Sequence, residues 1–285
     1  MATTFEPGEF RTAQRRQWNS AASGWKKWSP LIDQGGMPVS ERLVELARIK
    51  PGDRVLDVAA GYGEPALTAA KRVGPDGEVV ATDISAEMLA YGRERAAAAG
   101  LENVRFVESD AASLDFPEGS FDAALSRWGI IFEPEPEATA ARIRGFLKPG
   151  ARIAIASWGP IDRAPMFALT MGTVMKRLEI APPPPGTPGP LARPSPEAIA
   201  ALLEGGGFEN VEVEEIDVSF GYGSCDEFTA CLRDIAPPIT ALLAEYPQEV
   251  QEETWAAITA AAREAAGGDG PFELSNQALL AVGNA

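Results

Sequence analysis

The sequence predicts an α/β fold in which helices cover a doubly wound, largely parallel sheet. Between Val55 and Trp158, strand-like and helix-like segments alternate with turn signals between them, which is the pattern of a parallel sheet covered by helices. Five such strand–helix units fit into about a hundred residues. Because crossovers between parallel strands are nearly always right-handed, a doubly wound sheet follows.

Apolar runs, capping residues and prolines define the elements of this region. Pro65 is tolerated in the first turn of a helix, Ser85 can cap the next helix, and Pro136 can open a third, which Lys148-Pro149-Gly150 closes. The predicted strands are residues 54–59, 78–82, 104–107, 121–127 and 151–158, and the first two helices are residues 64–73 and 85–100.

The flanking segments are predicted to complete and cover the sheet. Residues 211–220 and 274–282 read as two further strands, and residues 181–196 hold eight prolines and form an extended connection before a short helix that ends at Gly205. Residues 226–266 have helical composition broken at Pro237 and Pro247. We therefore expect a helical leader or lid (1–50), a ligand-binding core (51–160), and a completing segment (161–285) with a helical cap at about 224–268.

The leader carries three tryptophans on one arc of a helix. Trp18, Trp25 and Trp28 stand at positions i, i+7 and i+10. Such an arc either packs into the core or forms a lid that excludes water from a site, and both roles are compatible.

The composition limits the class of partner. Acidic residues outnumber basic ones by 41 to 25, and the formal net charge of −16 would repel nucleic acid and anionic membranes. The chain has no run of about 18 apolar residues, and Met1–Phe5 lacks the features of an export signal. We expect a soluble, cytoplasmic monomer or homodimer, with Cys225 and Cys231 as reduced, structural thiols.

The chain contains no histidine. This removes the usual general base, the Ser-His-Asp and Cys-His nucleophile systems and the usual nitrogen ligands of zinc and iron. The chemistry must therefore need little proton transfer or use carboxylates, tyrosine or water, and we expect no metal site.

A candidate ligand site follows the first two strands. The first strand leads into Asp57-Val58-Ala59-Ala60-Gly61-Tyr62-Gly63, an acidic residue and a glycine-containing loop at the edge where open α/β sheets bind ligands. Asp83 ends the second strand, twenty residues beyond Gly63, and a carboxylate there can accept from both hydroxyls of a ribose.

The charges near this loop distinguish two ribose-containing ligands. Asp57 before the loop and Glu64 after it would repel the pyrophosphate of a nicotinamide dinucleotide, which prefers an uncharged loop. The amino group and the sulfonium of S-adenosylmethionine are cationic and would be attracted. S-adenosylmethionine therefore fits better than NAD.

Residues 51–160 resemble the class I S-adenosylmethionine-dependent methyltransferases, and in particular the UbiE-like group, whose motif is a strand followed by D-x-G-x-G-x-G. Ala59 departs from this motif, because it replaces the first glycine and restricts approach to the backbone there. The resemblance implies a Rossmann-like doubly wound sheet of seven strands, mostly parallel with the last strand antiparallel, and helical lid insertions.

The resemblance also implies roles for the cofactor-binding positions. Asp57, Gly61 and Gly63, with Ala59 in the same loop, would hold the methionine moiety, and Asp83 the ribose. Ile84 and Met88 would flank the adenine, and Asp110 would accept from its amino group beside the backbone of Ala111. Ser126, Arg127 and Trp128 would lie under the methionine end, where the acceptor meets the methyl group.

Several of these side chains have structural alternatives. Asp83 can cap the following helix, Asp110 can be an ordinary loop acid, and Met88 can simply fill the core. Arg127 and Trp128 can support the site rather than line it.

We therefore expect an S-adenosylmethionine-dependent methyltransferase that acts on a small, partly apolar molecule by in-line transfer to carbon, oxygen or nitrogen. The alternatives are an NAD(P)-dependent oxidoreductase and a cofactor-binding protein without transfer activity. Arg127, Trp128 and Tyr62 are the candidates for the acceptor site, and Tyr62, Asp226, Glu227 and water are the candidate bases. The sequence does not identify the acceptor.

Overall fold

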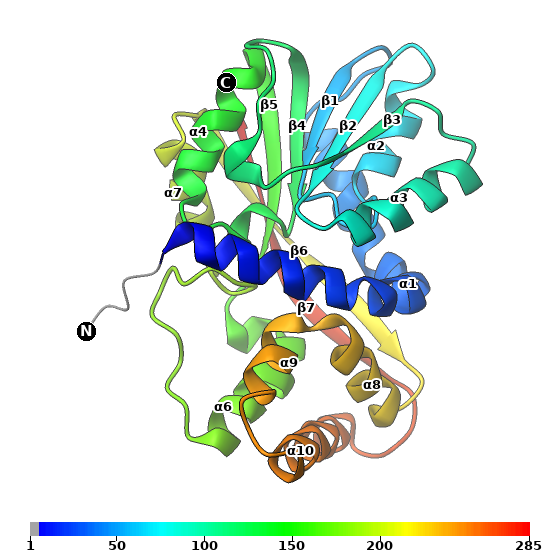
Figure 1. Ribbon diagram of the computed structural model, residues 1–285, viewed down its shortest axis with the longest axis vertical. Helices are drawn as coiled ribbons and strands as arrows, with labels where there is room; N and C mark the ends of the chain where they lie inside the picture. The colour runs from blue at the N-terminus through cyan, green and yellow to red at the C-terminus, as the bar shows by residue number, and fades with distance from the viewer. Residues whose placement is uncertain (1–5) are drawn as a thin grey trace.

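One seven-stranded sheet organises the computed structural model, which describes residues 6–285, so the expectation for Met1–Phe5 lies outside the described residues (Figure 1). The strand order is β3-β2-β1-β4-β5-β7-β6. The strands are β1 (Arg54–Val58), β2 (Glu78–Asp83), β3 (Val104–Glu108), β4 (Phe121–Arg127), β5 (Leu147–Trp158), β6 (Glu209–Tyr222) and β7 (Phe272–Asn284). β7 runs antiparallel to β5 and β6, whereas the pairs among β1 to β5 are parallel. The predicted sheet is confirmed.

Alternate residues of the central strands enter two separate hydrophobic layers. In β1, Val55 packs into the layer shared with α1 and α2, and Leu56 packs into the layer shared with α4 and α7. Both side chains are fully buried. Burial on both faces explains why these strands read as continuous apolar runs in the sequence.

The helices begin and end close to the predicted capping signals. Ser85 Oγ accepts a hydrogen bond from Met88 N at 3.1 Å, and Ser195 Oγ accepts from Ala198 N at 3.2 Å. The helices are α1 (Pro7–Leu46), α2 (Ala66–Val73), α3 (Ala86–Ala98), α4 (Pro136–Phe146), α5 (Pro165–Phe167), α6 (Thr173–Leu178), α7 (Pro196–Gly205), α8 (Cys225–Ile235), α9 (Pro237–Leu243) and α10 (Gln248–Ala266).

Two predicted boundaries are wrong. α2 begins at Ala66 rather than at Glu64, because Pro65 occupies the position before the helix, after a cis Glu64–Pro65 bond. Residues 148–150 do not simply close a helix, since β5 already begins at Leu147, which pairs with Phe121.

The predicted leader is a single 40-residue helix that contains Pro30 and Pro38. Its first part runs across the edge of the sheet at which the parallel strands end, and the rest turns toward β1 (Figure 1). α1 contacts α8, α9, α3 and β6. It therefore joins the sheet to the helices beyond this edge.

The cap contains more helix than the sequence predicted. α8, α9 and α10 occupy the expected block, and Pro237 and Pro247 stand at the predicted breaks. A second segment, α5, a π-helical stretch (Ala168–Gly172) and α6, packs against α10, although residues 161–178 gave no such prediction. Cys225 and Cys231 are buried and unoxidised, and burial raises the pKa of the Cys231 thiol to about 12.

Within residues 6–285, no helix has the length and apolar character that crossing a membrane requires.

Candidate cofactor and acceptor site

The carboxyl ends of β1, β2 and β4 bring the predicted site residues together. Asp57 of β1 pairs with Ala81 of β2 on one side and with Leu125 of β4 on the other. Asp83 and Ser126 therefore follow at the same edge, on the two neighbouring strands. This is where open α/β sheets place their ligands.

The loop after β1 is held in shape by Asp83. Its Oδ2 accepts from Gly61 N at 2.8 Å, and its Oδ1 accepts from Ser85 N at 2.8 Å. Gly61 and Gly63 have φ values of +53° and +113°, which glycine adopts without strain. Burial raises the pKa of Asp83 to about 6, although the backbone N–H bonds oppose this shift. The backbone N–H groups of Gly61, Ser85 and Ile84 use only part of the four lone-pair positions of the carboxylate, so a ribose hydroxyl can use one that remains.

Asp57 is the residue of this edge that best suits a cationic ligand. Its side chain is fully buried, and neither carboxylate oxygen has a hydrogen-bond partner among the described residues. Burial raises its pKa well above the ordinary value, and the positive charge of Arg127 and the nearby backbone N–H of Ala66, which does not reach hydrogen-bond geometry, offset this only in part. A buried carboxylate without a partner is costly, so a cationic ligand would relieve an existing defect.

A second unpartnered oxygen lies on the adenine side predicted from the resemblance. Asp110 Oδ1 is buried and accepts no hydrogen bond from residues 6–285, and Ala111 beside it is buried. Met88 is also buried and packs near Tyr62, whereas Ile84 is half-buried. A free acceptor next to an apolar side chain fits an adenine amino group, and so the residues present fit S-adenosylmethionine.

Ser126 and Ala59 shape the loops more than they face a ligand. Ser126 Oγ donates to Val58 O at 2.8 Å and accepts from Ile130 N at 3.0 Å, so its hydroxyl links β1 to the turn after β4. Ala59 adopts a left-handed φ of +57°. A Cβ at Gly129 would lie 2.4 Å from the methyl of Ala59, so this glycine permits the close contact between the two loops.

Arg127 and Tyr62, predicted to be acceptor-site candidates, instead belong to a polar network under α1. Arg127 Nη1 donates to Gly36 O and Ser40 Oγ, and its Nη2 donates to Tyr62 Oη at 3.1 Å. Burial raises the pKa of Tyr62 to about 12, so its phenol stays protonated and does not act as a base near neutral pH. Neither the Arg127 side chain nor the Tyr62 side chain lines the apolar cavity beside Trp128.

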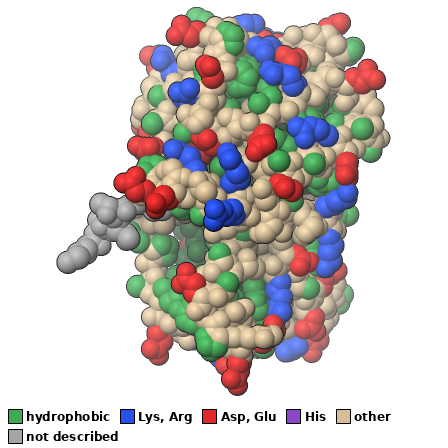
Figure 2. All heavy atoms as spheres, in the orientation of Figure 1, with side chains coloured by type: hydrophobic (Ala, Val, Ile, Leu, Met, Phe, Trp, Pro, Cys, Tyr) green, Lys and Arg blue, Asp and Glu red, His purple; other side chains and the backbone are tan. Residues whose placement is uncertain are grey.

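That cavity is the candidate acceptor pocket. It has a volume of about 160 Å³ and is bounded by α1, the strand ends, and the two cap segments. Figure 2 shows hydrophobic side chains around a hollow on this face, below α1. Its aromatic walls are Trp18, Trp25, Trp128, Phe132, Trp158, Phe167, Phe220 and Tyr222. No Asp, Glu, Lys or Arg in the described part of the chain lines it.

Trp128 is the one acceptor-site candidate that borders the cavity. Its ring stacks on Trp158, with centroids 4.2 Å apart and planes 8° apart. Its backbone has a left-handed φ of +56°, a strained conformation that is typical of functional positions. The candidate bases Asp226 and Glu227 do not line the cavity, because they occupy the first turn of α8, whereas its other end provides Leu232 and Ile235 to the cavity wall.

Sequence reasoning missed several cavity residues. Met166, Phe167, Thr170 and Met171 come from the segment between β5 and the proline-rich connection, and Pro190 comes from that connection. Pro165 at the start of α5 was the only local signal for this helix. The remaining turns are too short and irregular for a helical period to be recognised.

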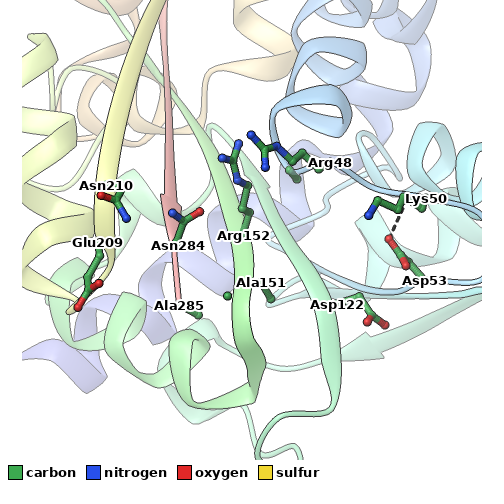
Figure 3. A pocket seen from close by; sticks show the side chains of 12 residues that line it. Arg48, Lys50, Asp53, Asp122, Ala151, Arg152, Glu209, Asn210, Asn284 and Ala285 are labelled. Carbon is green, nitrogen blue, oxygen red and sulfur yellow. Dashed lines mark hydrogen bonds between the residues drawn. The ribbon is translucent and has the colours of Figure 1, made fainter.

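A larger hollow of about 550 Å³ lies at the opposite edge of the sheet, where β5 and β1 begin (Figure 3). It is open and polar, and it contains both signs of charge, including Arg48, Arg152 and Asp53. Asp53 already accepts from Lys50 N at 2.7 Å. Because no predicted site residue reaches this edge, the size of this hollow does not make it the reaction site.

Residues 55–150 match the family model described as "Methyltransferase domain". The UbiE ubiquinone/menaquinone biosynthesis C-methyltransferase of Ectopseudomonas mendocina is 40% identical over 113 residues, which are 39% of this chain and 44% of that protein. The UbiE protein of Stutzerimonas stutzeri is 39% identical over 140 residues, 48% of this chain and 55% of that protein. The chain spans about half the length of the curated relatives it matches.

Two solved structures show how widely this fold is used. The Haemonchus contortus phosphoethanolamine N-methyltransferase 2, in complex with phosphomonomethylethanolamine and S-adenosylhomocysteine, aligns with a TM-score of 0.58 and 21% identity, over 96% of this chain and 59% of that chain. The [4+2]-cyclase SpnF aligns with a TM-score of 0.53 and 22% identity, over 86% of this chain and 79% of that chain. The fold is therefore shared, and the chemistry must be argued from the site.

Proposed function

We propose that this protein, whose residues 55–150 form a class I methyltransferase domain of the UbiE-like kind, transfers a methyl group from S-adenosylmethionine to a small, partly apolar molecule. The observation that supports this most directly is Asp57, fully buried with two carboxylate oxygens that lack a partner among residues 6–285. This carboxylate suits the amino group of the methionine moiety. Asp83 and Asp110 would hold the ribose and the adenine amino group.

The residues of the site would work by positioning and by excluding water. When bound, S-adenosylmethionine supplies an activated methyl group on a cationic sulfur. The stacked Trp128 and Trp158 would orient a flat acceptor beside it, and α1 with the cap would exclude water. No carboxylate in the described part of the chain lines the cavity, and the pKa of Tyr222, its one phenol, is raised by burial. We therefore favour an acceptor that reacts without a strong base.

The residues argue against the nicotinamide alternative. Asp57 and Glu64 are both buried beside the loop that a pyrophosphate would approach. Calorimetry should show binding of S-adenosylmethionine and S-adenosylhomocysteine, and no binding of NAD. Tighter binding of NAD than of S-adenosylmethionine would overturn the proposal.

The fold similarity to a [4+2]-cyclase makes methyl transfer itself worth a separate test. The protein with S-adenosylmethionine labelled in the methyl group should transfer label to members of a panel of uncharged aromatic molecules. Binding of the cofactor without transfer to any extractable small molecule would favour the cofactor-binding alternative.

We also expect transfer to be independent of divalent metal ions, because an activated sulfonium needs no Lewis acid. Loss of transfer in a chelator, with recovery on adding magnesium, would contradict this expectation.

A further inference from the structure

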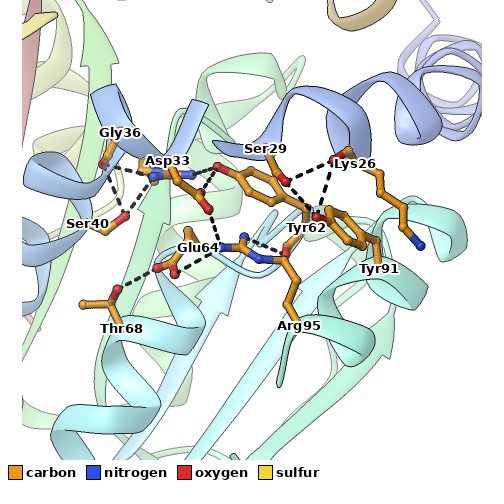
Figure 4. Close-up of polar contacts among 11 residues, drawn as sticks. Lys26, Ser29, Asp33, Gly36, Ser40, Tyr62, Glu64, Thr68, Tyr91 and Arg95 are labelled. Carbon is orange, nitrogen blue, oxygen red and sulfur yellow. Dashed lines mark hydrogen bonds and ion pairs between the residues drawn. The ribbon is translucent and has the colours of Figure 1, made fainter. Parts of the chain in front are cut away.

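A chain of buried polar contacts joins α1 to the loop that would hold the cofactor (Figure 4). Tyr62, which lies between Gly61 and Gly63, donates from its hydroxyl to Asp33 Oδ1 of α1 at 2.8 Å. The same hydroxyl accepts from Arg127 at the end of β4, and Arg127 also donates to Gly36 O at 3.0 Å. One arginine and one tyrosine thus connect β4, the loop and α1.

A second arginine closes this chain on the other side. Arg95 of α3 donates to Asp33 Oδ2 at 2.6 Å and to the backbone oxygen of Tyr62 at 3.2 Å. It also lies 3.8 Å from a carboxylate oxygen of Glu64. Arg95 therefore pairs with Asp33 and Glu64, and the charge of Arg127 is shared among these carboxylates and Asp57.

The sequence of α1 provides room for the contact. Gly36 stands inside a helix, where glycine is about 1 kcal/mol less favourable than alanine. A Cβ at this position would lie 2.8 Å from Arg127 Nη1. The glycine therefore allows the guanidinium group to approach the backbone of α1 closely.

Tyr62 is well placed to transmit the state of the loop. Both of its neighbours are glycines with positive φ, so a change in the shape of the loop is opposed mainly by the contacts that anchor it, at Asp83 and through Tyr62 to α1. Its ring packs against Trp25 of α1, with centroids 5.5 Å apart. The loop can keep this shape with the Tyr62 side chain bound to α1, or it can move and release both the Tyr62 side chain and α1.

We infer that Arg127 is a positioning residue that, through Tyr62 and Asp33, latches α1 onto the cofactor loop and so sets how long the cofactor stays bound. Because Gly36, Ser40 and Tyr62 hold its guanidinium group, Arg127 would act through these contacts rather than as a ligand of the cofactor or the acceptor. The inference rests on the proposed function, since it assigns a regulatory role within the same site. It also predicts that opening α1 and loosening the loop are one event.

The test compares two Tyr→Phe variants of the full chain. Y62F removes the hydroxyl from the latch and keeps the ring. Y91F is the matched control, because the Tyr91 hydroxyl also bonds to α1, with Ser29 Oγ at 2.7 Å and Lys26 O at 3.5 Å, but makes no hydrogen bond to the Arg127 chain. The rings of Tyr62 and Tyr91 stack on each other, and both variants keep this stack. In stopped-flow displacement of S-adenosylhomocysteine, Y62F should release it about tenfold faster, the scale of one hydrogen bond to a charged group. Y91F should stay within about twofold of the wild type.

A double variant tests whether the residues act together. D33N should speed release like Y62F, and D33N with Y62F should add less than about twofold to either, since both break one chain. Equal release rates for Y62F and Y91F would overturn the latch. So would a lower melting temperature of Y62F without faster release, which would indicate a purely structural role.

Trypsin cleavage after Lys26 and Lys27 in α1 provides a readout that needs no cofactor. Without any ligand, Y62F should be cut several-fold faster there than the wild type, and equal cleavage of Y62F and the wild type would again overturn the latch. Y91F is not the control for this measurement, because Tyr91 Oη donates to Lys26 O at the cleavage site itself. If the wild type bound no S-adenosylhomocysteine, the proposed function would fail, and this second measurement would still decide on the latch.

Discussion

The proposed cofactor edge, at the carboxyl ends of β1, β2 and β4, and the proposed acceptor cavity beside Trp128 differ in the side chains that form them. At the cofactor edge, Asp57 and Asp110 keep buried oxygens without partners among the described residues, and Asp83 stays buried with a raised pKa. The cavity beyond Trp128 is lined mainly by aromatic and aliphatic side chains, together with Thr170, and by no ionised group from residues 6–285. The first region presents unpartnered carboxylate oxygens, whereas the second is mainly apolar and its unpartnered polar atom among the described residues is the donor Trp128 Nε1.

This difference indicates how binding and specificity are divided. Unsatisfied buried acceptors define one ligand closely, because each demands a donor at a fixed place. An apolar cavity selects by size and shape, which discriminates less sharply between similar molecules. We therefore expect substitutions at the edge to affect the cofactor alone, and substitutions in the cavity wall to affect the acceptor alone.

The largest expected effect comes from filling the cavity. Ala236 lines it, and A236W would add a side chain comparable in size to the 160 Å³ space. Transfer to an acceptor found by labelling should fall at least about a hundredfold, while the affinity for S-adenosylhomocysteine stays within about twofold. A260W, on the exposed face of α10, is the matched control. A parallel loss of cofactor affinity in A236W would show that the two regions are not separate.

At the cofactor edge, D57N should weaken S-adenosylmethionine binding about thirtyfold, or ~2 kcal/mol, the scale of a lost charge-assisted hydrogen bond. The same change should raise the melting temperature by about 2 °C, because burial disfavours the charged form of this carboxyl group and raises its pKa, and an amide carries no charge to bury. Calorimetry and thermal unfolding of one sample test both effects. If D57N lowered the melting temperature and left binding unchanged, Asp57 would be a structural residue.

The sequence predicts the cofactor edge better than the cavity, because the residues of the edge lie close together in the chain and those of the cavity do not. Asp57, Gly61 and Asp83 lie at strand ends within one short segment, so their meeting at the edge follows from the strand pattern. The cavity depends on contacts such as Trp25 Nε1 to Ile235 O, 210 residues apart, and no local pattern encodes these.

Arg127 illustrates the same limit. The sequence correctly placed it at the end of β4, but its partners Gly36 and Ser40 lie about 90 residues earlier. From the sequence alone, without these long-range hydrogen bonds, Arg127 is easily assigned to the lining of the acceptor site. The proposed cofactor contacts themselves stay predictions until binding is measured.

A smaller effect is expected from pH, since the pKa of Asp83 is about 6. An ionised carboxylate accepts from both ribose hydroxyls, so the affinity for S-adenosylmethionine should fall about tenfold from pH 7 to pH 5 as Asp83 gains a proton. Because this pKa is raised in the folded state, the same protonation favours folding, and the contribution of Asp83 to stability rises as the pH falls through 6. D83N removes the titrating group, and an identical pH profile for D83N would assign the step to another residue.

The smallest expected effect is that of A59G on stability, at the motif position where alanine replaces glycine. Ala59 has a left-handed φ of +57°, which is unfavourable for a residue with a Cβ by about 1–2 kcal/mol. A59G removes this strain but gives the unfolded chain more freedom, which offsets about 0.5–1 kcal/mol. The free energy of unfolding should therefore rise by about 0.5 kcal/mol, with cofactor affinity unchanged within about twofold, because the methyl group packs against Gly129 rather than at Asp57.

A60G is the matched control, since Ala60 is buried and has no positive φ, and it should be destabilised by about 1 kcal/mol. Chemical denaturation of the two variants separates the explanations: equal losses of stability would mean that the left-handed backbone at Ala59 carries no strain, and a gain in affinity in A59G would mean that its methyl group reaches the cofactor site.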